Sequence, residues 1–245
     1  TAVFIALAVS AASVIGMSAC SRKPIVVGFI GPMTGPTANI GVEGHRGFSL
    51  AVAERNEAGG VLGRDVEVRM LDDRADPGSC LEAAKELLAQ GVNLVVLHTT
   101  SGAAAGALPW LTGQDVLVVS RTVSDPAWAD KDDNFLRFVG STDPFGQSLA
   151  AFALAKGVRT AAFIADTKNR AYAESIAAEF IGSGGALSVS GSRWVDSGFS
   201  HDEAAVWALS SSPDAVLAVL AGLDAAQLAH ALDRQGFKGT LLLAP

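Results

Sequence analysis

Residues 25–41 read IVVGFIGPMTGPTANIG, and this stretch decides the fold. Its first part, residues 25–30, is a short aliphatic run rich in β-branched residues, which is typical of a strand. Three glycines and two prolines then follow in residues 31–41, and such a density of both residues predicts a loop. Because glycine lets the backbone come close to other groups, we expect this loop to approach a ligand or another part of the chain.

Strand-length aliphatic runs recur and alternate with helix-length segments. After the run at 25–30, the first half has strands at 66–71, 93–98, 116–120 and 135–139, with helical segments at 43–57, 80–90 and 103–112. Asp76 followed by Pro77 is a favourable helix start, and Gly91 is a favourable helix end. Strands that alternate with helices predict a parallel sheet with helices on both faces.

The same alternation begins again in the second half. Strands are expected at 161–165, 186–194, 215–220 and 240–244, and helices at 170–183, 201–210 and 224–236. The turn-forming stretch GSTDP, residues 140–144, separates the two series. The sequence therefore predicts an α/β protein with two Rossmann-like lobes, an N-terminal lobe at 20–140 and a second lobe at 141–245.

The N-terminus has the pattern of an export signal. Residues 1–21 carry no charged side chain, and small residues precede Cys20. This is typical of a secretory signal peptide, which we place at residues 1–19. The letters MSAC at 17–20 resemble a bacterial lipobox, so we expect Cys20 to be lipidated and to become the mature N-terminus. The alternative is an uncleaved anchor, since about 20 apolar residues span a bilayer.

The composition argues against several classes of protein. A net charge of -7 and a pI near 5.0 disfavour nucleic acid or an anionic membrane surface as a partner. Cys20 and Cys80 are the two cysteines, so with Cys20 lipidated no disulfide framework is expected. The histidines lack zinc-site spacing, and neither a G-x-S-x-G elbow nor a G-x-G-x-x-G motif is present. We therefore expect no metal, no cofactor and no enzymatic activity.

Two more loops leave the sheet edge where the first strand ends. TTSG at 99–102 follows the third strand, and SRTVSDP at 120–126 follows the fourth. The carboxyl ends of parallel strands meet at one edge, and ligands collect there in open α/β sheets. We therefore expect Ser101, Thr122 and Ser124 to direct their hydroxyls toward one point.

The start of the helix after the third strand suits an anion. The N–H groups of Gly102 and Ala103 lie at this helix start, where a carboxylate is favourably bound. Simpler interpretations remain open for the hydroxyls. Ser101 is also a good helix N-cap, and Thr122 and Ser124 are also ordinary turn residues.

Four motifs together resemble the leucine/isoleucine/valine-binding family, the type I periplasmic solute-binding proteins that serve ABC transporters. The motifs are VVGFIGPMTGPTANIG, AVAERNEAGGVLGRDVEVRMLDDRADP, SDPAW and LRFVGSTDPFGQ. The similarity runs from about Pro24 to Pro245, and NEAGGVLGRDVEV followed by DDRADP is its most specific part. The resemblance implies a two-lobed receptor that closes on a small solute. In that family the chain returns to the first lobe after the position of Pro245, so the sequence looks C-terminally truncated.

The resemblance also implies site residues. In relatives, groups at the positions of Ser101, Gly102, Thr122, Val123 and Ser124 hold the carboxylate and ammonium of an amino acid. These positions therefore form the expected ligand-binding set in the first lobe.

Three positions depart from the family pattern, and one of them is Ala221, near which the family has an aromatic side chain. Ile40 stands where an aromatic side chain often covers the ligand, and Arg170 stands where the family has a tyrosine. A guanidinium pairs well with carboxylates, so Arg170 favours an anionic ligand. The alternative is that Arg170 is solvated at a helix start.

The resemblance thus implies an extracytoplasmic substrate-binding component of an ABC importer, which binds an amino acid or related small carboxylate between its lobes. The expected partners are that solute and a permease in the membrane. We expect a monomer that contacts the membrane only through a lipid on Cys20. The alternative function is a ligand-sensing receptor or regulator domain of the same fold.

Overall fold

The aliphatic runs of the first half form one parallel sheet. The computed structural model describes residues 23–244, so the predicted signal peptide and Cys20 lie outside the described residues. The strands lie in the order β2-β1-β3-β4-β5, and each neighbouring pair is parallel. Their bounds are Ile25–Gly31 for β1, Val66–Asp72 for β2, Leu94–Leu97 for β3, Leu117–Ser120 for β4 and Phe135–Arg137 for β5.

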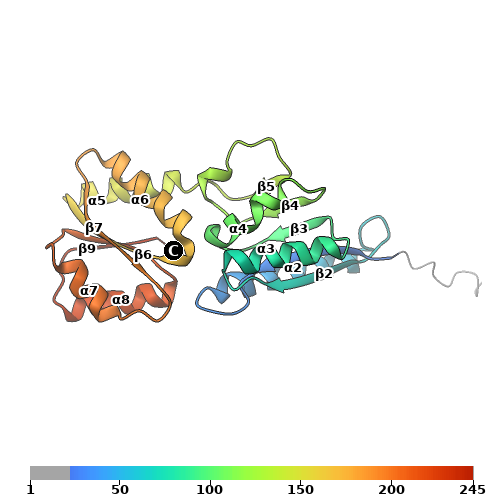
Figure 1. Ribbon diagram of the computed structural model, residues 1–245, viewed down its shortest axis with the longest axis horizontal. Helices are drawn as coiled ribbons and strands as arrows, with labels where there is room; N and C mark the ends of the chain where they lie inside the picture. Colours follow the sequence, from blue (N-terminus) through green and yellow to red (C-terminus); the bar gives the residue numbers. More distant parts are fainter. Residues whose placement is uncertain (1–22, 245) are drawn as a thin grey trace, which may run out of the picture.

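Helices lie on both faces of this sheet (Figure 1). Helix α2 spans Ala38–Glu57, α3 spans Pro77–Ala89, α4 spans Ser101–Leu111, and the 3-10 helix η1 spans Pro126–Trp128. Helix α3 begins as the sequence predicts, because the side chain of Asp76 accepts a hydrogen bond from the N–H of Ser79 at 2.8 Å. Gly91, with a φ of 80°, follows the end of this helix, as a helix-terminating glycine does.

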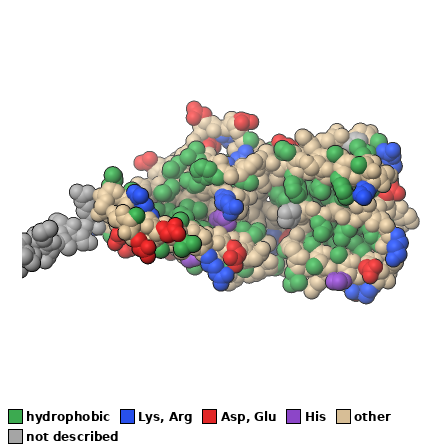
Figure 2. Space-filling view, turned by 180° about the vertical axis from the view of Figure 1, so that it is seen from behind, with side chains coloured by type: hydrophobic (Ala, Val, Ile, Leu, Met, Phe, Trp, Pro, Cys, Tyr) green, Lys and Arg blue, Asp and Glu red, His purple; other side chains and the backbone are tan. Residues whose placement is uncertain are grey.

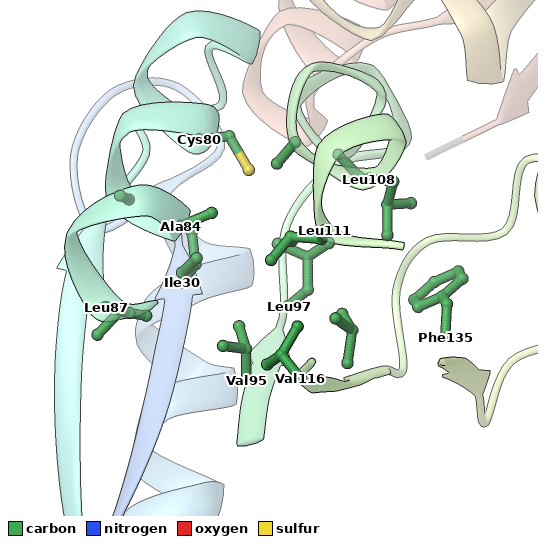
Figure 3. Packing of buried hydrophobic residues seen from close by; sticks show 14 of the residues in the cluster. Ile30, Cys80, Ala84, Leu87, Val95, Leu97, Leu108, Leu111, Val116 and Phe135 are labelled. Atoms are coloured by element: carbon green, nitrogen blue, oxygen red, sulfur yellow. The ribbon is translucent and has the colours of Figure 1, made fainter. Parts of the chain in front are cut away.

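The main core of the first lobe lies between the sheet and helices α3 and α4. Ile30 and Val95 on the strands meet Leu108 and Leu111 on α4, and all four are fully buried (Figure 3). Cys80 of α3 belongs to the same cluster. Each large aliphatic side chain buried in this way contributes roughly 1.5–3 kcal/mol, so this layer fixes α4 firmly against the sheet.

The second half forms a parallel sheet of its own, in the order β7-β6-β8-β9. The strands are β6 Thr160–Asp166, β7 Ser188–Val195, β8 Ala215–Val219 and β9 Thr240–Ala244. Helices α5 (Asp143–Ala155) and α6 (Arg170–Gly184) cover one face, and α7 (His201–Leu209) and α8 (Gly222–Arg234) cover the other. The 3-10 helix η2, Thr167–Asn169, connects β6 to α6. The chain is thus an α/β protein with two Rossmann-like lobes, as predicted.

Two helices differ from the sequence expectation. Helix α2 begins at Ala38 instead of residue 43, so the predicted glycine loop is shorter. Its glycines allow close packing inside the first lobe: a Cβ on Gly41 would lie 2.1 Å from the carbonyl oxygen of Pro32, and one on Gly44 would lie 2.3 Å from the His98 ring. Helix α5 was not predicted, because its first residues, DPFG, read as part of a turn.

The chain passes from one sheet to the other between β5 and α5. At this passage the N–H of Thr142 donates to the carbonyl of Ser124 at 3.0 Å. The hydroxyl of Thr142 lies 2.6 Å from that of Ser175 on α6. The connection is therefore tied by hydrogen bonds to both lobes.

One face of the first sheet is only partly covered. Helix α2 packs against β1 and β2, while β4 and the segment beginning with β5 leave Leu117, Leu136 and Phe138 exposed by 41%, 49% and 74%. Their strand neighbours Val118 and Phe135 point to the opposite face and are buried. Figure 2, seen from behind Figure 1, shows hydrophobic side chains gathered on this lobe. Within residues 23–244, no helix combines the length and apolar character needed to cross a bilayer.

Candidate functional site

A cavity of about 140 Å³ lies between the two lobes. The first lobe lines it with Thr37, Asn39, Ile40 and Thr100, and the second lobe lines it with Asp166, Asn169 and residues 219–222. These segments follow β1, β3, β6 and β8, so the cavity lies at the carboxyl ends of strands from both sheets. That is where open α/β sheets bind ligands, and domain interfaces are common places for pockets.

The cavity lining combines polar and apolar groups. Thr37, Asn39 and Thr100 supply hydroxyl and amide groups from the first lobe, while Val219 and Leu220 supply an apolar wall from the second. Its lining contains one carboxylate and no lysine or arginine. A ligand in this cavity therefore meets both hydrogen-bonding groups and aliphatic surface.

A smaller cavity of about 20 Å³ shares part of this lining. Thr37, Thr100, Asp166 and Asn169 border both spaces, and the smaller one adds Pro36, Arg74, Ala75 and Lys168. Arg74 and Lys168 thus border the smaller cavity and not the main one. Arg74 and Ala75 have φ values of 54° and 53°, a left-handed conformation that is costly for residues other than glycine and recurs at functional sites.

Asp166 is the carboxylate of the main cavity, at the end of β6. Its Oδ1 accepts a hydrogen bond from the N–H of Lys168 at 2.8 Å, which caps η2. Burial raises the pKa of Asp166, and the nearby carboxylates of Asp224 and Asp196 act in the same direction. The capping N–H and the charge of Lys168 oppose this shift. A cationic or hydrogen-bond-donating ligand group would be favourably placed beside Asp166.

The structure brings the predicted hydroxyl loops of the first lobe together. Ser101 Oγ accepts a hydrogen bond from the N–H of Ser124 at 3.3 Å, and Thr122 Oγ1 donates to the carbonyl of Thr99 at 2.8 Å. These groups thus have hydrogen-bond partners within the first-lobe loops, and neither Ser101, Thr122 nor Ser124 lines the main cavity. The interpretation of Ser101 as the N-cap is wrong, because Thr100 Oγ1 accepts the capping bond from the N–H of Ala103.

The backbone donors predicted to hold a carboxylate also have partners in the protein. The buried Val123 donates its N–H to Ser120 Oγ at 3.1 Å. Gly102 donates its N–H to the side-chain oxygen of Asn169 at 3.0 Å, across the cleft. Of the predicted first-lobe ligand residues, Ile40 lines the main cavity, so it remains the most direct candidate for ligand contact.

Arg170 lies outside the main cavity, at the start of α6. Its Nε donates to Glu174 Oε1 at 2.7 Å, and its guanidinium lies over the ring of Trp194 at 4.5 Å. The side chain is 58% exposed. Both contacts lie within the second lobe, so Arg170 is engaged by a carboxylate and an aromatic ring of its own lobe.

Sequence reasoning missed several lining residues. Asn39, Thr100, Asp166 and Asn169 line the cavity but were not predicted to do so. The signal was present for Asp166 and Asn169, because they follow the first strand of the second sheet, where the rule used for the first lobe applies equally. Among residues 23–244, no group of three His, Cys, Asp or Glu side chains is placed to hold a metal ion.

The fold and its cleft define a class of two-lobed proteins with a site between the lobes. Residues 24–245 match the sequence profile of the family described as periplasmic binding protein. The chain therefore belongs to the periplasmic binding protein family, a solute-binding and extracytoplasmic family that is not a family of enzymes.

Individual relatives are consistent with this assignment. The "Leu/Ile/Val-binding protein homolog 3" of Brucella melitensis is 30% identical over 147 residues, which are 60% of this chain and 40% of the relative. A crystal structure of the branched-chain amino acid transporter substrate binding protein LivJ from Streptococcus pneumoniae, in complex with isoleucine, matches with a TM-score of 0.79 at 22% identity. The match covers 90% of this chain and 64% of that one.

A second solved structure has a different ligand. The solute binding protein of an ABC transporter from Rhodopseudomonas palustris, in complex with 3,4-dihydroxy benzoic acid, matches with a TM-score of 0.74 at 18% identity. The match covers 90% of this chain and 61% of that one. The chain thus spans less than two thirds of the length of these relatives.

Proposed function

We propose that this protein is the extracytoplasmic substrate-binding component of an ABC importer, and that it binds an amino acid or related small carboxylate between its two lobes. The observation that carries the proposal is the cavity of about 140 Å³, which both lobes line at the carboxyl ends of their strands. A solute in this position contacts both lobes at once, so binding favours the closed arrangement of the lobes.

The size and chemistry of the cavity support a small solute. The walls combine the hydroxyls of Thr37 and Thr100 with the aliphatic side chains of Ile40 and Val219, which suits a molecule with a polar end and an apolar end. Asp166 is placed to receive a hydrogen-bond donor such as an ammonium or a phenolic hydroxyl. The named ligands of the two related structures, isoleucine and 3,4-dihydroxybenzoic acid, each carry an apolar part and such a donor.

The proposal includes delivery to a permease. A lipid on Cys20 would keep the protein at the membrane surface, where a monomer with a closed, loaded cleft can meet its transporter. Metabolic labelling with a radioactive fatty acid tests the lipid directly. We expect incorporation into the protein and its loss in Cys20→Ser, and unlabelled protein would contradict the anchor but not the solute site.

A ligand screen tests solute binding. We expect one or more of L-leucine, L-isoleucine, L-valine, benzoate and 3,4-dihydroxybenzoate to raise the thermal unfolding temperature of the protein. A ligand present at 100 times its dissociation constant adds about 2.7 kcal/mol to the stability of the native state. No shift with these or with a wider set of small carboxylates would contradict the proposed solute class.

A substitution in the cavity wall tests the position of the site. Ile40→Trp places an indole in the cavity, so we expect it to abolish the thermal shift. Leu50→Trp is the matched control, since Leu50 lies on the same helix and is 62% exposed. An undiminished shift in Ile40→Trp would place the site elsewhere.

A further inference from the structure

Asn169 is placed at the N-terminus of α6, yet its side chain bonds to the other lobe. Among the described residues, no N–H of the first turn of α6 donates to it. Its Oδ1 instead accepts the hydrogen bond from the N–H of Gly102, at 3.0 Å, in the first turn of α4. Asparagine at an N-cap normally accepts from its own helix. The side chain thus satisfies a donor across the cleft in place of one in its own helix.

The position that Asn169 occupies is one that attracts anions. The first N–H groups of a helix point outward without helical partners and carry partial positive charge. In α4, Thr100 Oγ1 accepts the N–H of Ala103, and Asn169 accepts that of Gly102. The amide oxygen of Asn169 therefore takes the donor that an anionic group of a solute would use.

The backbones of the two lobes approach closely at the hydrogen bond between Gly102 and Asn169. A Cβ on Gly102 would lie 2.1 Å from the carbonyl oxygen of Lys168 and 2.9 Å from the Cα of Asn169. Helix α4 also packs against η2 and α6. A side chain at position 102 would force the lobes apart, so the glycine is required for Asn169 to reach α4.

We propose that Asn169 is an internal latch, which holds the two lobes together by occupying the Gly102 N–H, and that an anionic group of the solute competes with it for this donor. A hydrogen bond between an amide and a neutral acceptor is weaker than one to a carboxylate. A carboxylate can therefore replace Asn169 at this donor, whereas a neutral amide gains nothing by the exchange. The latch therefore lowers the affinity for anionic solutes, which must displace it, and leaves the affinity for neutral solutes unchanged; this second part rests on the proposed solute-binding function.

Small-angle X-ray scattering of the whole protein without added solute tests the latch itself. We expect Asn169→Ala to increase the radius of gyration, because the cross-lobe bond is lost and open forms become populated. Asn169→Asp should stay as compact as the wild type, because a carboxylate at a helix N-terminus makes a stronger bond. An unchanged radius of gyration in Asn169→Ala would overturn the latch.

Two further variants control this measurement. Gln147→Ala removes an exposed amide whose bond to Glu179 lies within the second lobe, so we expect no change in radius. Asn169→Ser is too short to reach Gly102 and should open the protein as alanine does. Circular dichroism confirms that each variant is folded, and if alanine and serine both leave a folded, compact protein the latch is overturned.

Calorimetric titration tests the competition. We expect Asn169→Ala to bind a carboxylate probe, L-leucine or benzoate, about fivefold more tightly than the wild type, as the loss of one competing neutral hydrogen bond predicts. Affinity for the neutral probes leucinamide and benzamide should stay unchanged. Equal tightening for neutral and anionic probes would overturn the competition. If no probe binds any variant while Asn169→Ala still opens, the proposed function fails and the latch stands.

Discussion

Gly102 in the first lobe lies against Lys168 in the second so closely that a Cβ on the glycine would come within 2.1 Å of the Lys168 carbonyl oxygen. Real Cβ atoms do not approach a backbone oxygen so closely, and neither backbone segment can give way easily. The lobes therefore meet in this arrangement only while position 102 has no side chain.

Gly102→Ala should consequently keep the lobes apart. We expect a larger radius of gyration in solution scattering and a weaker thermal shift with any solute that bridges the lobes. The folded state of each lobe should be unaffected, since alanine is favourable in a helix. Gly182→Ala is the matched control, because Gly182 also lies in a helix and has open space around it. A variant as compact as the wild type would show that the lobes close without this contact.

The fold followed from the sequence because its signals are local. Aliphatic runs such as those at 25–30 and 215–220 fall on strands β1 and β8, since a strand buried on both faces must be apolar throughout. The position at which α2 begins could not be predicted from the sequence. Gly41 and Gly44 are typical of a loop, and only the folded structure shows that they pack against Pro32 and His98. Helix propensity is overridden there by tertiary contacts.

The candidate site could be predicted only in part from the sequence. The rule that ligands collect at the carboxyl ends of strands correctly brought the loops of Ser101 and Thr122 together. The rule cannot predict whether the polar groups of these loops remain free to bind a ligand. That depends on partners within the protein, such as Thr99 and Ser124, whose positions are set by the folded loops. The hydrogen bond of Asn169 to Gly102 was unpredictable for the same reason, since the two residues lie 67 positions apart in the sequence and on different lobes.

Replacing each of the two phenylalanines near β5 by alanine should change the free energy of unfolding by very different amounts. Phe135 is 7% exposed and packs in the core of the first lobe, so Phe135→Ala should cost about 3–5 kcal/mol of unfolding free energy. Phe138 is 74% exposed on the other face of the sheet, so Phe138→Ala should change stability by less than about 0.5 kcal/mol. Urea unfolding followed by fluorescence measures both, and equal costs would contradict this orientation of the strand.

The partly covered face of the first sheet should bind apolar dyes. Exposed contiguous apolar surface is uncommon on soluble domains, and Leu117, Leu136 and Phe138 contribute to it here. Replacing all three by threonine should reduce the fluorescence of bound 8-anilinonaphthalene-1-sulfonate while the far-ultraviolet circular dichroism stays unchanged. As a control, Leu223→Thr removes a side chain of the second lobe that is 71% exposed, and it should leave most of the signal. Undiminished dye binding in the triple variant would show that another surface is responsible.

Asp73 should make the stability of the protein fall as the pH rises. This side chain is fully buried at the end of β2, where its Oδ1 accepts the N–H of Ala75 at 2.9 Å. Burial raises the pKa of Asp73 above its ordinary value of 3.8. The folded state therefore holds this proton more tightly than the unfolded state, so the contribution of Asp73 to stability is greatest below pH 3.8 and is lost as the pH rises through the raised pKa.

Asp73→Asn should remove this decline, because an amide can accept the Ala75 N–H without carrying a buried charge. Each unit of pKa difference is worth about 1.4 kcal/mol, so we expect the variant to be more stable than the wild type at neutral pH. Asp214→Asn is the opposite case: hydrogen bonds from the N–H groups of Arg159 and Thr160 lower the pKa of Asp214, so this variant should lose stability at neutral pH. Urea unfolding from pH 2 to pH 8 covers both titrations, with the effect of Asp214 lost as the pH falls below 3.8. Parallel curves for wild type and Asp73→Asn would show that Asp73 is not protonated preferentially in the folded state.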